Sequence, residues 1–256
     1  MKFIIGFFMA WGNFITLPCP YKRWDSNLKN MMLAFLPGVG VVVGVLWMAI
    51  FAALDGWLSL PPMITSLIMI YYIFAVCGFM HMDGFMDCND AIMSRRPLED
   101  RQRILKDSLV GAFAVVTAVF LILAWFATMT TIMDAGKFNT VELHLLLLPV
   151  LSRGVSGLHV LTCKPIGHSQ YVEDFEEQGR GRYRAAVVLQ MAVVFAITAV
   201  LAGDIVTTAV TALTVIAANV IACAYARKQL GGMSGDIAGY AICISELAGV
   251  LALAII

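Results

Sequence analysis

Residues 185–226 read AAVVLQMAVVFAITAVLAGDIVTTAVTALTVIAANVIACAYA, and Asp204 is the one charged side chain among them. Each half of this stretch has close to the roughly 20 apolar residues that an α-helix needs to cross about 30 Å of hydrocarbon. The dipeptide 203–204 (GD) separates the halves and is typical of a tight turn. The stretch therefore predicts two neighbouring transmembrane helices, 185–203 and 205–226.

The same pattern recurs along the rest of the chain. Of its 256 residues 61% are hydrophobic and 13% charged, whereas a soluble domain carries about 25% charged residues. Breaks rich in Gly, Pro and Asp divide the apolar runs into seven predicted spans: 33–54, 62–82, 109–133, 141–162, 185–203, 205–226 and 237–256. We expect an all-α protein, a polytopic transmembrane helical bundle, built as a single integral membrane domain over residues 1–256.

Small residues within the predicted spans indicate close helix packing. Gly38, Gly40 and Gly44 lie in one predicted span and suit a near approach of another backbone. Three cysteines lie in apolar runs without zinc-ligand spacing and are predicted to be small buried hydrophobes: Cys77, Cys223 and Cys243.

The first residues of the chain do not fit a full span. Lys2 and the apolar run that follows it resemble a signal peptide, but no small-residue cleavage site comes next. Residues 16–20 (TLPCP) end the run early. We predict a short N-terminal helix in the membrane interface, or a re-entrant helix, that stays in the mature protein.

Basic residues orient the predicted bundle. They cluster before the first span and in the connections between spans two and three, four and five, and six and seven, which alternation places on one side: Lys22, Arg23, Lys29, Arg95, Arg96, Arg101, Arg103, Lys106, Lys164, Arg180, Arg182, Arg184, Arg227 and Lys228. The opposite connections contain Lys137 alone. By the positive-inside rule the basic side is cytoplasmic, which predicts a multi-pass protein of the cell inner membrane. The formal net charge of zero gives no case for a nucleic-acid partner.

Three aspartates follow the second predicted span. Asp83, Asp87 and Asp90 lie at positions i, i+4 and i+7, so a continuous helix projects all three from one face. Like charges on one helix face repel, and carboxylates near a membrane are costly unless a cation neutralises them. Oxygen ligands favour Mg²⁺ or Mn²⁺ over zinc. The alternative is a solvated helix end, although apolar side chains flank the aspartates.

Further charged residues lie near the predicted cytoplasmic side. Arg101, Arg103 and the segment 106–108 (KDS) could clamp phosphates beside a metal, or serve as ordinary membrane anchors. The polar loop 163–184 is either solvated or a substrate lid.

Two sites lie within or beside late spans. Arg153, in the segment 152–154 (SRG), falls inside an apolar span and needs an anionic partner or ligand. The glycine-rich segment 231–239 (GGMSGDIAG) permits close backbone approach to a ligand, and Asp236 and the intramembrane Glu246 are candidate acids. Metal ions, cations and carboxylates at one face favour phosphoryl transfer, because a transporter is expected to place its charges near the midplane.

These segments resemble one known family, the cobalamin synthases, which are adenosylcobinamide-GDP ribazoletransferases. The resemblance covers nearly the whole chain, and its motifs occur in the family's order at 16–20 (TLPCP), 37–40 (PGVG), 77–90 (CGFMHMDGFMDCND), 106–111 (KDSLVG), 152–154 (SRG) and 231–239 (GGMSGDIAG). Three departures occur: Ala91 replaces a glycine, Cys243 stands where many members have a glutamate, and one extra residue separates Gly78 from His81. They put the role of Glu246 in doubt and leave the aspartates intact.

The resemblance implies a reaction. The ribose 3′-hydroxyl of α-ribazole, or of its 5′-phosphate, attacks the β-phosphorus of adenosylcobinamide-GDP, and GMP leaves, with Mg²⁺ as the required cofactor. The implied catalytic residues are Asp83, Asp87, Asp90, Lys106 and Arg153. The implied metal ligands are Asp83, Asp87, Asp90 and Asp236. The implied substrate-binding residues are His81, Arg103, Asp107, Ser108, Ser234, Gly235, Asp236 and Glu246.

Two other hypotheses remain open at this point. A CDP-alcohol phosphotransferase also carries repeated aspartates on membrane helices, but the residues after Gly84 fit its motif poorly. A secondary transporter could use the aspartates as a cation site. The sequence does not decide between a monomer and a homo-oligomer.

Overall fold

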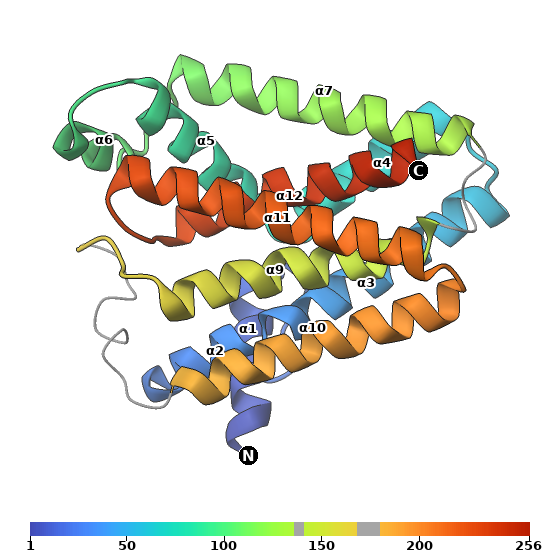
Figure 1. Cartoon of the computed structure of the whole chain (residues 1–256), viewed down its shortest axis with the longest axis horizontal. Coiled ribbons are helices and arrows are strands. Elements are labelled where there is room, and N and C mark those ends of the chain that lie inside the picture. Colours follow the sequence, from blue (N-terminus) through green and yellow to red (C-terminus); the bar gives the residue numbers. More distant parts are fainter. Residues whose placement is uncertain (136–140, 168–179) are drawn as a thin grey trace.

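The computed structural model describes residues 1–135, 141–167 and 180–256 of the chain. Within these ranges the chain is helical and contains no strand (Figure 1). The elements in chain order are α1 (Lys2–Phe14), η1 (Ser26–Leu28), α2 (Lys29–Ala34), α3 (Leu36–Ala52), η2 (Ala53–Trp57), α4 (Pro62–Ala75), α5 (Met80–Met93), α6 (Leu98–Ile104), α7 (Ala112–Asp134), α9 (His144–Thr162), α10 (Arg180–Ala202), α11 (Ile205–Leu230) and α12 (Gly235–Ile255).

The structure confirms the predicted polytopic bundle. Among the described residues six helices are long and apolar enough to cross a membrane, and the bent pair of α4 and α5 can form a seventh. The turn between α10 and α11 falls where it was predicted, with Gly203 at a positive φ of 67° and Asp204 capping α11. The Asp204 side chain accepts a hydrogen bond from the backbone N–H of Thr207, 3.0 Å away. Hydrogen bonds from Thr207 lower the pKa of this carboxyl group.

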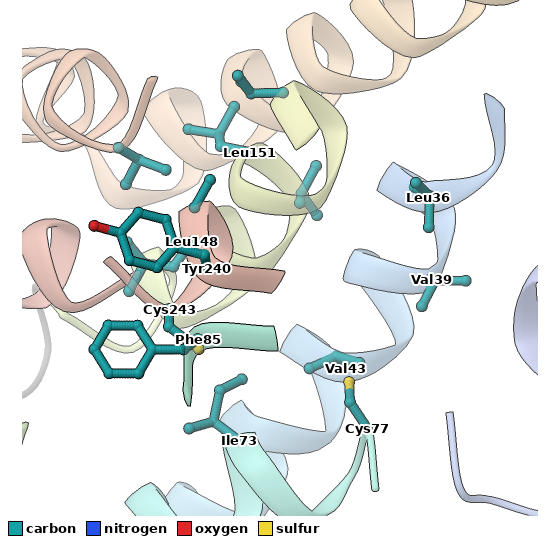
Figure 2. Packing of buried hydrophobic residues seen from close by; sticks show 14 of the residues in the cluster. Leu36, Val39, Val43, Ile73, Cys77, Phe85, Leu148, Leu151, Tyr240 and Cys243 are labelled. Carbon is teal, nitrogen blue, oxygen red and sulfur yellow. The ribbon is translucent and has the colours of Figure 1, made fainter. Parts of the chain in front are cut away.

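Helix α9 lies at the centre of the bundle. It contacts α3, α10, α11 and α12, and it is the most enclosed of the six candidate spans, whereas α10 is the least. Figure 1 shows α7, α9, α10 and α11 running roughly parallel. Buried side chains of several helices fill the space between them, among them Val43 of α3, Ile73 of α4 and Leu148 of α9 (Figure 2).

Glycines set the contact between α3 and α9. A Cβ atom added at Gly40 would lie 2.5 Å from the carbonyl oxygen of Pro149, and one at Gly44 would lie 2.7 Å from Cα of Leu146. Only glycine allows the two backbones to approach this closely. The prediction from Gly40 and Gly44 is confirmed, whereas a Cβ at Gly38 would have no contact closer than 3.5 Å.

The second predicted span, 62–82, is wrong as one continuous helix. The chain breaks between Ala75 and Met80, and α4 and α5 meet at 82°. Gly78 and Phe79 both have positive φ angles, of 61° and 59°, which no α-helix contains. A long apolar run predicts that a segment can cross the membrane, but it does not predict a turn of the backbone within that segment. The three aspartates nevertheless share one helix, because α5 runs without interruption over Met80–Met93.

The predicted N-terminal helix exists and meets this break. Helix α1 runs across the direction of the long helices (Figure 1) and packs on α2 and α3. After it, the backbone N–H of Thr16 donates to the carbonyl oxygen of Val76 at 2.9 Å, and the Thr16 hydroxyl donates to the same oxygen at 3.1 Å. The segment 16–20 thus satisfies a carbonyl group that the broken helix leaves free. Placement of α1 in the interface or as a re-entrant helix stays a prediction.

The first predicted span, 33–54, is also corrected. Helix α2 ends at Ala34, Phe35 interrupts it, and α3 begins at Leu36 with Pro37 in its first turn. Proline is tolerated in a first turn but removes a backbone donor further inside, so the chain restarts a helix here.

The basic segments lie at one end of the bundle. Figure 1 shows α6, the start of α10 and the turn from α11 to α12 at the left end, with the C-terminus and the turn from α10 to α11 at the right. Lys137 and most of the loop 163–184, including its predicted lid, lie outside the described residues.

Candidate active site

Helices α5 and α12 cross in close contact. A Cβ atom at Gly84 would lie 2.7 Å from the carbonyl oxygen of Asp236, and one at Gly239 would lie 3.1 Å from Cα of His81. Beside this crossing the rings of Phe85 and Tyr240 stack with centroids 5.6 Å apart (Figure 2). The glycines therefore bring the aspartate helix and the start of α12 together.

The crossing gathers carboxylates from two separate motifs. Asp87 interacts electrostatically with Asp83, with Asp236 and with Asp90, and each of these is a repulsion between like charges. Repulsion of this kind is relieved by a bound cation. Asp83 is exposed and Asp87 is half-buried, so the carboxylates of α5 that lie closest to α12 are open to a ligand.

A cavity of about 150 Å³ opens beside these carboxylates. Asp83, Asp236, His81 and Arg153 contribute to its polar wall. Larger apolar side chains from six helices also line it: Phe14, Leu33, Leu36, Met80, Val160 and Ile242. The cavity thus joins predicted site residues from the second, fourth and seventh predicted spans.

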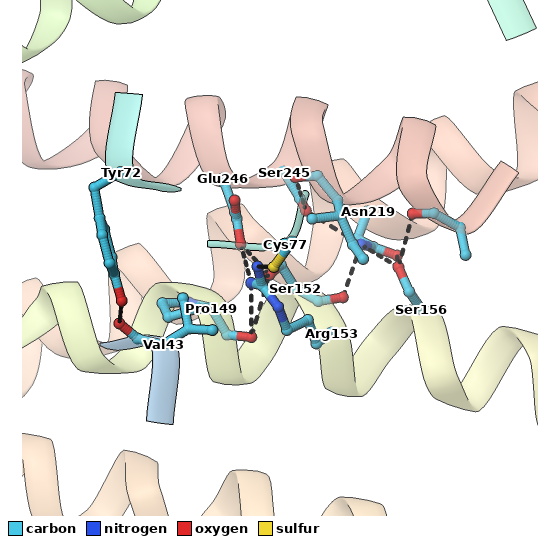
Figure 3. Close-up of polar contacts among 12 residues, drawn as sticks. Val43, Tyr72, Cys77, Pro149, Ser152, Arg153, Ser156, Asn219, Ser245 and Glu246 are labelled. Atoms are coloured by element: carbon cyan, nitrogen blue, oxygen red, sulfur yellow. Dashed lines mark hydrogen bonds and ion pairs between the residues drawn. The ribbon is translucent and has the colours of Figure 1, made fainter. Parts of the chain in front are cut away.

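Arg153 makes a buried ion pair with Glu246. Its Nη1 lies 2.5 Å from Oε1 of Glu246, and the two side chains are 1% and 4% exposed (Figure 3). Ser152 donates to the same carboxylate oxygen at 2.7 Å, and Nη2 of Arg153 contacts Sγ of Cys77 at 3.3 Å. The predicted need of Arg153 for an anionic partner is confirmed. Its partner is a carboxylate from α12, so the pair neutralises two costly charges together.

A second polar cluster lies next to the ion pair. Asn219 of α11 donates to the carbonyl oxygen of Ser152 at 3.2 Å, to the hydroxyl of Ser156 at 3.0 Å and to the hydroxyl of Ser245 at 3.1 Å (Figure 3). These bonds tie α9, α11 and α12 together behind the cavity. The orientation of the Asn219 amide is fixed by this network.

Asp90 has different partners from the other aspartates of α5. Its two carboxylate oxygens accept hydrogen bonds from the backbone N–H groups of Gly111, at 2.5 Å, and Ala114, at 2.9 Å. A Cβ atom at Gly111 would lie 2.6 Å from either oxygen, so glycine is required there. Asp90 is therefore the N-terminal cap of α7, supplied from another helix.

The segment between α6 and α7 lies outside the cavity lining. Lys106, Asp107 and Ser108 are all exposed, and Asp107 shares a separate groove of about 340 Å³ with Asp90. Arg103 is exposed and pairs with Asp100 at 2.5 Å. The structure thus divides the predicted site residues between the cavity and this groove. Asp87 interacts electrostatically with Asp83 and Asp236 of the cavity and with Asp90 of the groove.

The glycine-rich turn before α12 has a structural explanation. Gly231 ends α11 with a φ of 81°, and a Cβ at Gly232 would lie 2.8 Å from the backbone nitrogen of Ile166. Ser234 caps α12 by accepting from the N–H of Ile237, and it donates to the Asp236 carboxylate at 3.2 Å. The turn therefore fixes the position of Asp236, while Gly235 lines the cavity.

The chain is similar to known proteins over nearly its whole length. A family model described as cobalamin-5-phosphate synthase matches residues 6–254. The chain belongs to this family. A protein named adenosylcobinamide-GDP ribazoletransferase from Clostridium perfringens (strain 13 / Type A) is 34% identical over 249 residues, covering 97% of this chain and 96% of that protein.

More distant members of the cobalamin-5-phosphate synthase family bear the same name. The protein from Clostridium botulinum (strain Alaska E43 / Type E3) is 30% identical over 95% of this chain and 94% of its own length. The one from Geobacillus kaustophilus (strain HTA426) is 27% identical over 91% of this chain and 89% of its own. No solved structure matches the chain.

The carboxylate oxygens at the crossing of α5 and α12 are of the ligand type that Mg²⁺ prefers. No group of three or more His, Cys, Asp or Glu side chains in the described ranges is already arranged to hold a metal ion. Mg²⁺ is commonly held by one or two carboxylates, with substrate phosphates and waters completing the octahedron. Asp83 and Asp236, which line one cavity, can supply such a pair. The predicted metal roles of Asp83, Asp87, Asp90 and Asp236 stay predictions.

Several polar residues of the site were not found from the sequence. Cys77 was predicted to be a small buried hydrophobe, and it is buried, but it also contacts Arg153. Asn219, Ser156 and Ser245 were not singled out. A polar side chain within an apolar span is the signal that could have found Asn219.

Proposed function

We propose that this chain joins α-ribazole, or its 5′-phosphate, to adenosylcobinamide-GDP. The ribose 3′-hydroxyl oxygen forms a bond to the β-phosphorus, and the bond from that phosphorus to the oxygen of GMP breaks. The hydroxyl proton passes to a carboxylate, and GMP leaves with the bonding electrons. The products are adenosylcobalamin, or its 5′-phosphate, and GMP, which makes this the last assembly step of cobalamin synthesis.

The observation that carries this proposal is the meeting of α5 and α12. It brings Asp87 near Asp83 and Asp236, and the latter two line a cavity, in a chain whose family and relatives bear the corresponding names. Carboxylates in this position can take the proton of an incoming hydroxyl group. Asp83 and Asp236 are the best placed, because both line the cavity.

We assign Mg²⁺ as the cofactor of this reaction. A magnesium ion held at the crossing of α5 and α12 would supply positive charge to neutralise the pyrophosphate and the leaving GMP. Asp83, Asp87 and Asp236 are the residues that would hold it. Asp90 is the weakest of the predicted ligands, because both of its oxygens accept hydrogen bonds from the start of α7.

Cations have two different proposed roles. Arg153 is already paired with Glu246, so it acts on a ligand from a fixed position in the cavity wall. Lys106 is exposed at the basic end, so its flexible side chain can reach a charged phosphate of the substrate.

We propose that the protein lies in the cell inner membrane and that its basic end faces the cytoplasm. Thiol labelling of Arg95→Cys in a Cys19→Ser background tests this orientation. Burial raises the pKa of the Cys163 thiol, so that cysteine reacts slowly at neutral pH and gives little background. Modification of residue 95 by an impermeant reagent in intact cells, without lysis, contradicts the orientation.

A defined assay tests the function. Purified protein in lipid, with Mg²⁺, adenosylcobinamide-GDP and α-ribazole, is expected to release GMP, and omission of α-ribazole is expected to stop the release. Asp87→Asn is expected to insert normally and to lose turnover. Absence of GMP release from the wild-type protein under these conditions rejects the proposed function.

A further inference from the structure

The cavity beside the carboxylates is lined by two kinds of side chain. Asp83 and Asp236 lie in its polar wall, whereas Phe14, Val160 and Ile242 are among the apolar side chains that line it. Helix α1 contributes Asn13 and Phe14, so the N-terminal helix encloses the cavity from outside the bundle. A ligand group that fits here must be largely apolar and must lie next to the acids.

The size of the cavity restricts that group. An apolar cavity of about 150 Å³ is known to hold one benzene molecule. The cavity between α1, α5, α9 and α12 has about the same volume, 150 Å³, and it is partly open. It can take a small ring system whose remainder extends outward, and it is too small for a macrocycle or a whole nucleotide.

Two buried polar atoms in the wall need a partner. Nε of Arg153 and Nε2 of His81 have no hydrogen-bond partner among the described residues. Both residues line the cavity, and Arg153 is 1% exposed. Leaving such groups unsatisfied is costly, so the ligand is expected to offer at least one hydrogen-bonding ring atom.

Among the parts of the two proposed substrates, one meets these requirements. The corrin macrocycle exceeds the volume, and guanine carries several donors and acceptors along its edges, more than the two unpartnered atoms of the wall can match. The base of α-ribazole is a small aromatic ring system with a ring nitrogen that accepts a hydrogen bond. Resting on the proposed function, we infer that this cavity binds the aromatic base of α-ribazole and directs its ribose toward Asp83 and Asp236.

This placement has a consequence for the reaction. With the base enclosed among α1, α9 and α12, the ribose lies at the cavity mouth, where the acids are. The activated corrinoid then approaches from the open side without entering the cavity. Residues of the apolar lining consequently determine which bases the protein accepts, and they leave recognition of the GDP group unchanged.

A filling variant tests the inference. Ala238 lines the cavity, and Ala238→Leu places three more carbon atoms in it. Ala217→Leu is the matched control, because Ala217 is exposed on the outer surface of α11. Steady-state GMP release gives the KM of each substrate, and equilibrium dialysis with α-ribazole gives binding without turnover.

The expected result is specific to one substrate. Ala238→Leu is expected to raise the KM and the Kd for α-ribazole by about tenfold or more, the scale of a steric misfit in an apolar pocket, and to change the KM for adenosylcobinamide-GDP by less than about twofold. Ala217→Leu is expected to change neither. An unchanged Kd for α-ribazole, or a rise confined to adenosylcobinamide-GDP, overturns the inference.

A second variant covers the case in which Ala238→Leu does not insert. Phe14→Ala widens the cavity on the side of α1, and it is expected to raise kcat/KM for a ribazole with a three-ring base, relative to the two-ring base, by about fivefold. An unchanged ratio contradicts the inference. Lack of GMP release by the wild-type protein rejects the proposed function instead, so the two failures are distinguishable.

Discussion

Two regions of α5 contain aspartates of the same motif, but their carboxylates have different neighbours. At the crossing with α12, Asp83 and Asp87 face another carboxylate, Asp236, and the three repel one another through Asp87. One helical turn further, Asp90 gives both oxygens to the N–H groups that begin α7. A carboxylate among carboxylates favours a cation, whereas one at a helix N-terminus is already stabilised. Aspartates of one motif on one helix face therefore do not all have the same role.

The largest expected effect comes from the crossing itself. Asp236→Asn is expected to lower the rate of GMP release by about 100-fold or more, because it removes a charge that acts in the transition state. Asp204→Asn is the matched control, since Asp204 caps α11 at the opposite end of the bundle and asparagine also caps helices. If Asp236→Asn releases GMP at the wild-type rate, Asp236 and the start of α12 are not part of the reaction site.

The next effect concerns the ion pair behind the cavity. Glu246→Ala leaves Arg153 buried without its partner, which is expected to cost about 3–5 kcal/mol of stability. The double variant Arg153→Met, Glu246→Leu is expected to regain most of that loss. Thermal unfolding in detergent measures both. If the single variant is as stable as the wild-type protein, the pair does not organise the wall of the cavity.

The sequence predicts the bundle well because hydrophobicity decides it. The two helices around Gly203 are confirmed, and the described residues contain six candidate spans, or seven if the bent pair of α4 and α5 forms one. The break before α5 was missed, because a single glycine such as Gly78 is common within membrane helices, and Phe79 is not a residue type that predicts a positive φ. Transporters often contain broken helices, so the break between α4 and α5 makes the position of the charges a weaker reason to exclude a transporter. The family match is now the main reason to prefer an enzyme.

The candidate site was predicted in parts. Arg153 and Glu246 were each singled out, yet their pairing needs the packing of α9 on α12. The capping of α7 by Asp90 was not predictable, since it joins residues 21 positions apart through the path of α6. A spacing pattern describes one helix, whereas these contacts depend on how helices meet.

A moderate effect is expected at the α7 cap. Asp90→Ala is expected to lose about 1–2 kcal/mol of stability, as for other helix caps, and to expose the N–H groups of Gly111 and Ala114 to hydrogen exchange. Gly111→Ala is expected to cause the same change by steric conflict. Unchanged exchange at these amides in Asp90→Ala contradicts the capping role and returns Asp90 to the group of metal ligands.

The smallest effect is expected at the exposed end of α6. Arg103→Ala removes an ion pair between two solvent-exposed side chains, which contributes less than about 1 kcal/mol. We expect the KM for adenosylcobinamide-GDP to stay within about twofold of the wild-type value, because Asp100 already holds the guanidinium group. A tenfold rise in that KM would contradict this expectation and would indicate that Arg103 contacts the substrate phosphates.

The comparison of GMP release by Asp83→Asn and Asp100→Asn shows whether the reaction takes place at the crossing of α5 and α12. Both variants make the same chemical change at carboxylates of the basic end, but only Asp83 lines the cavity. With saturating Mg²⁺ and both substrates, Asp83→Asn is expected to lose about 100-fold in rate, while Asp100→Asn stays within about threefold of the wild-type protein. Equal rates for the two variants would contradict the assignment of the crossing of α5 and α12 as the active site.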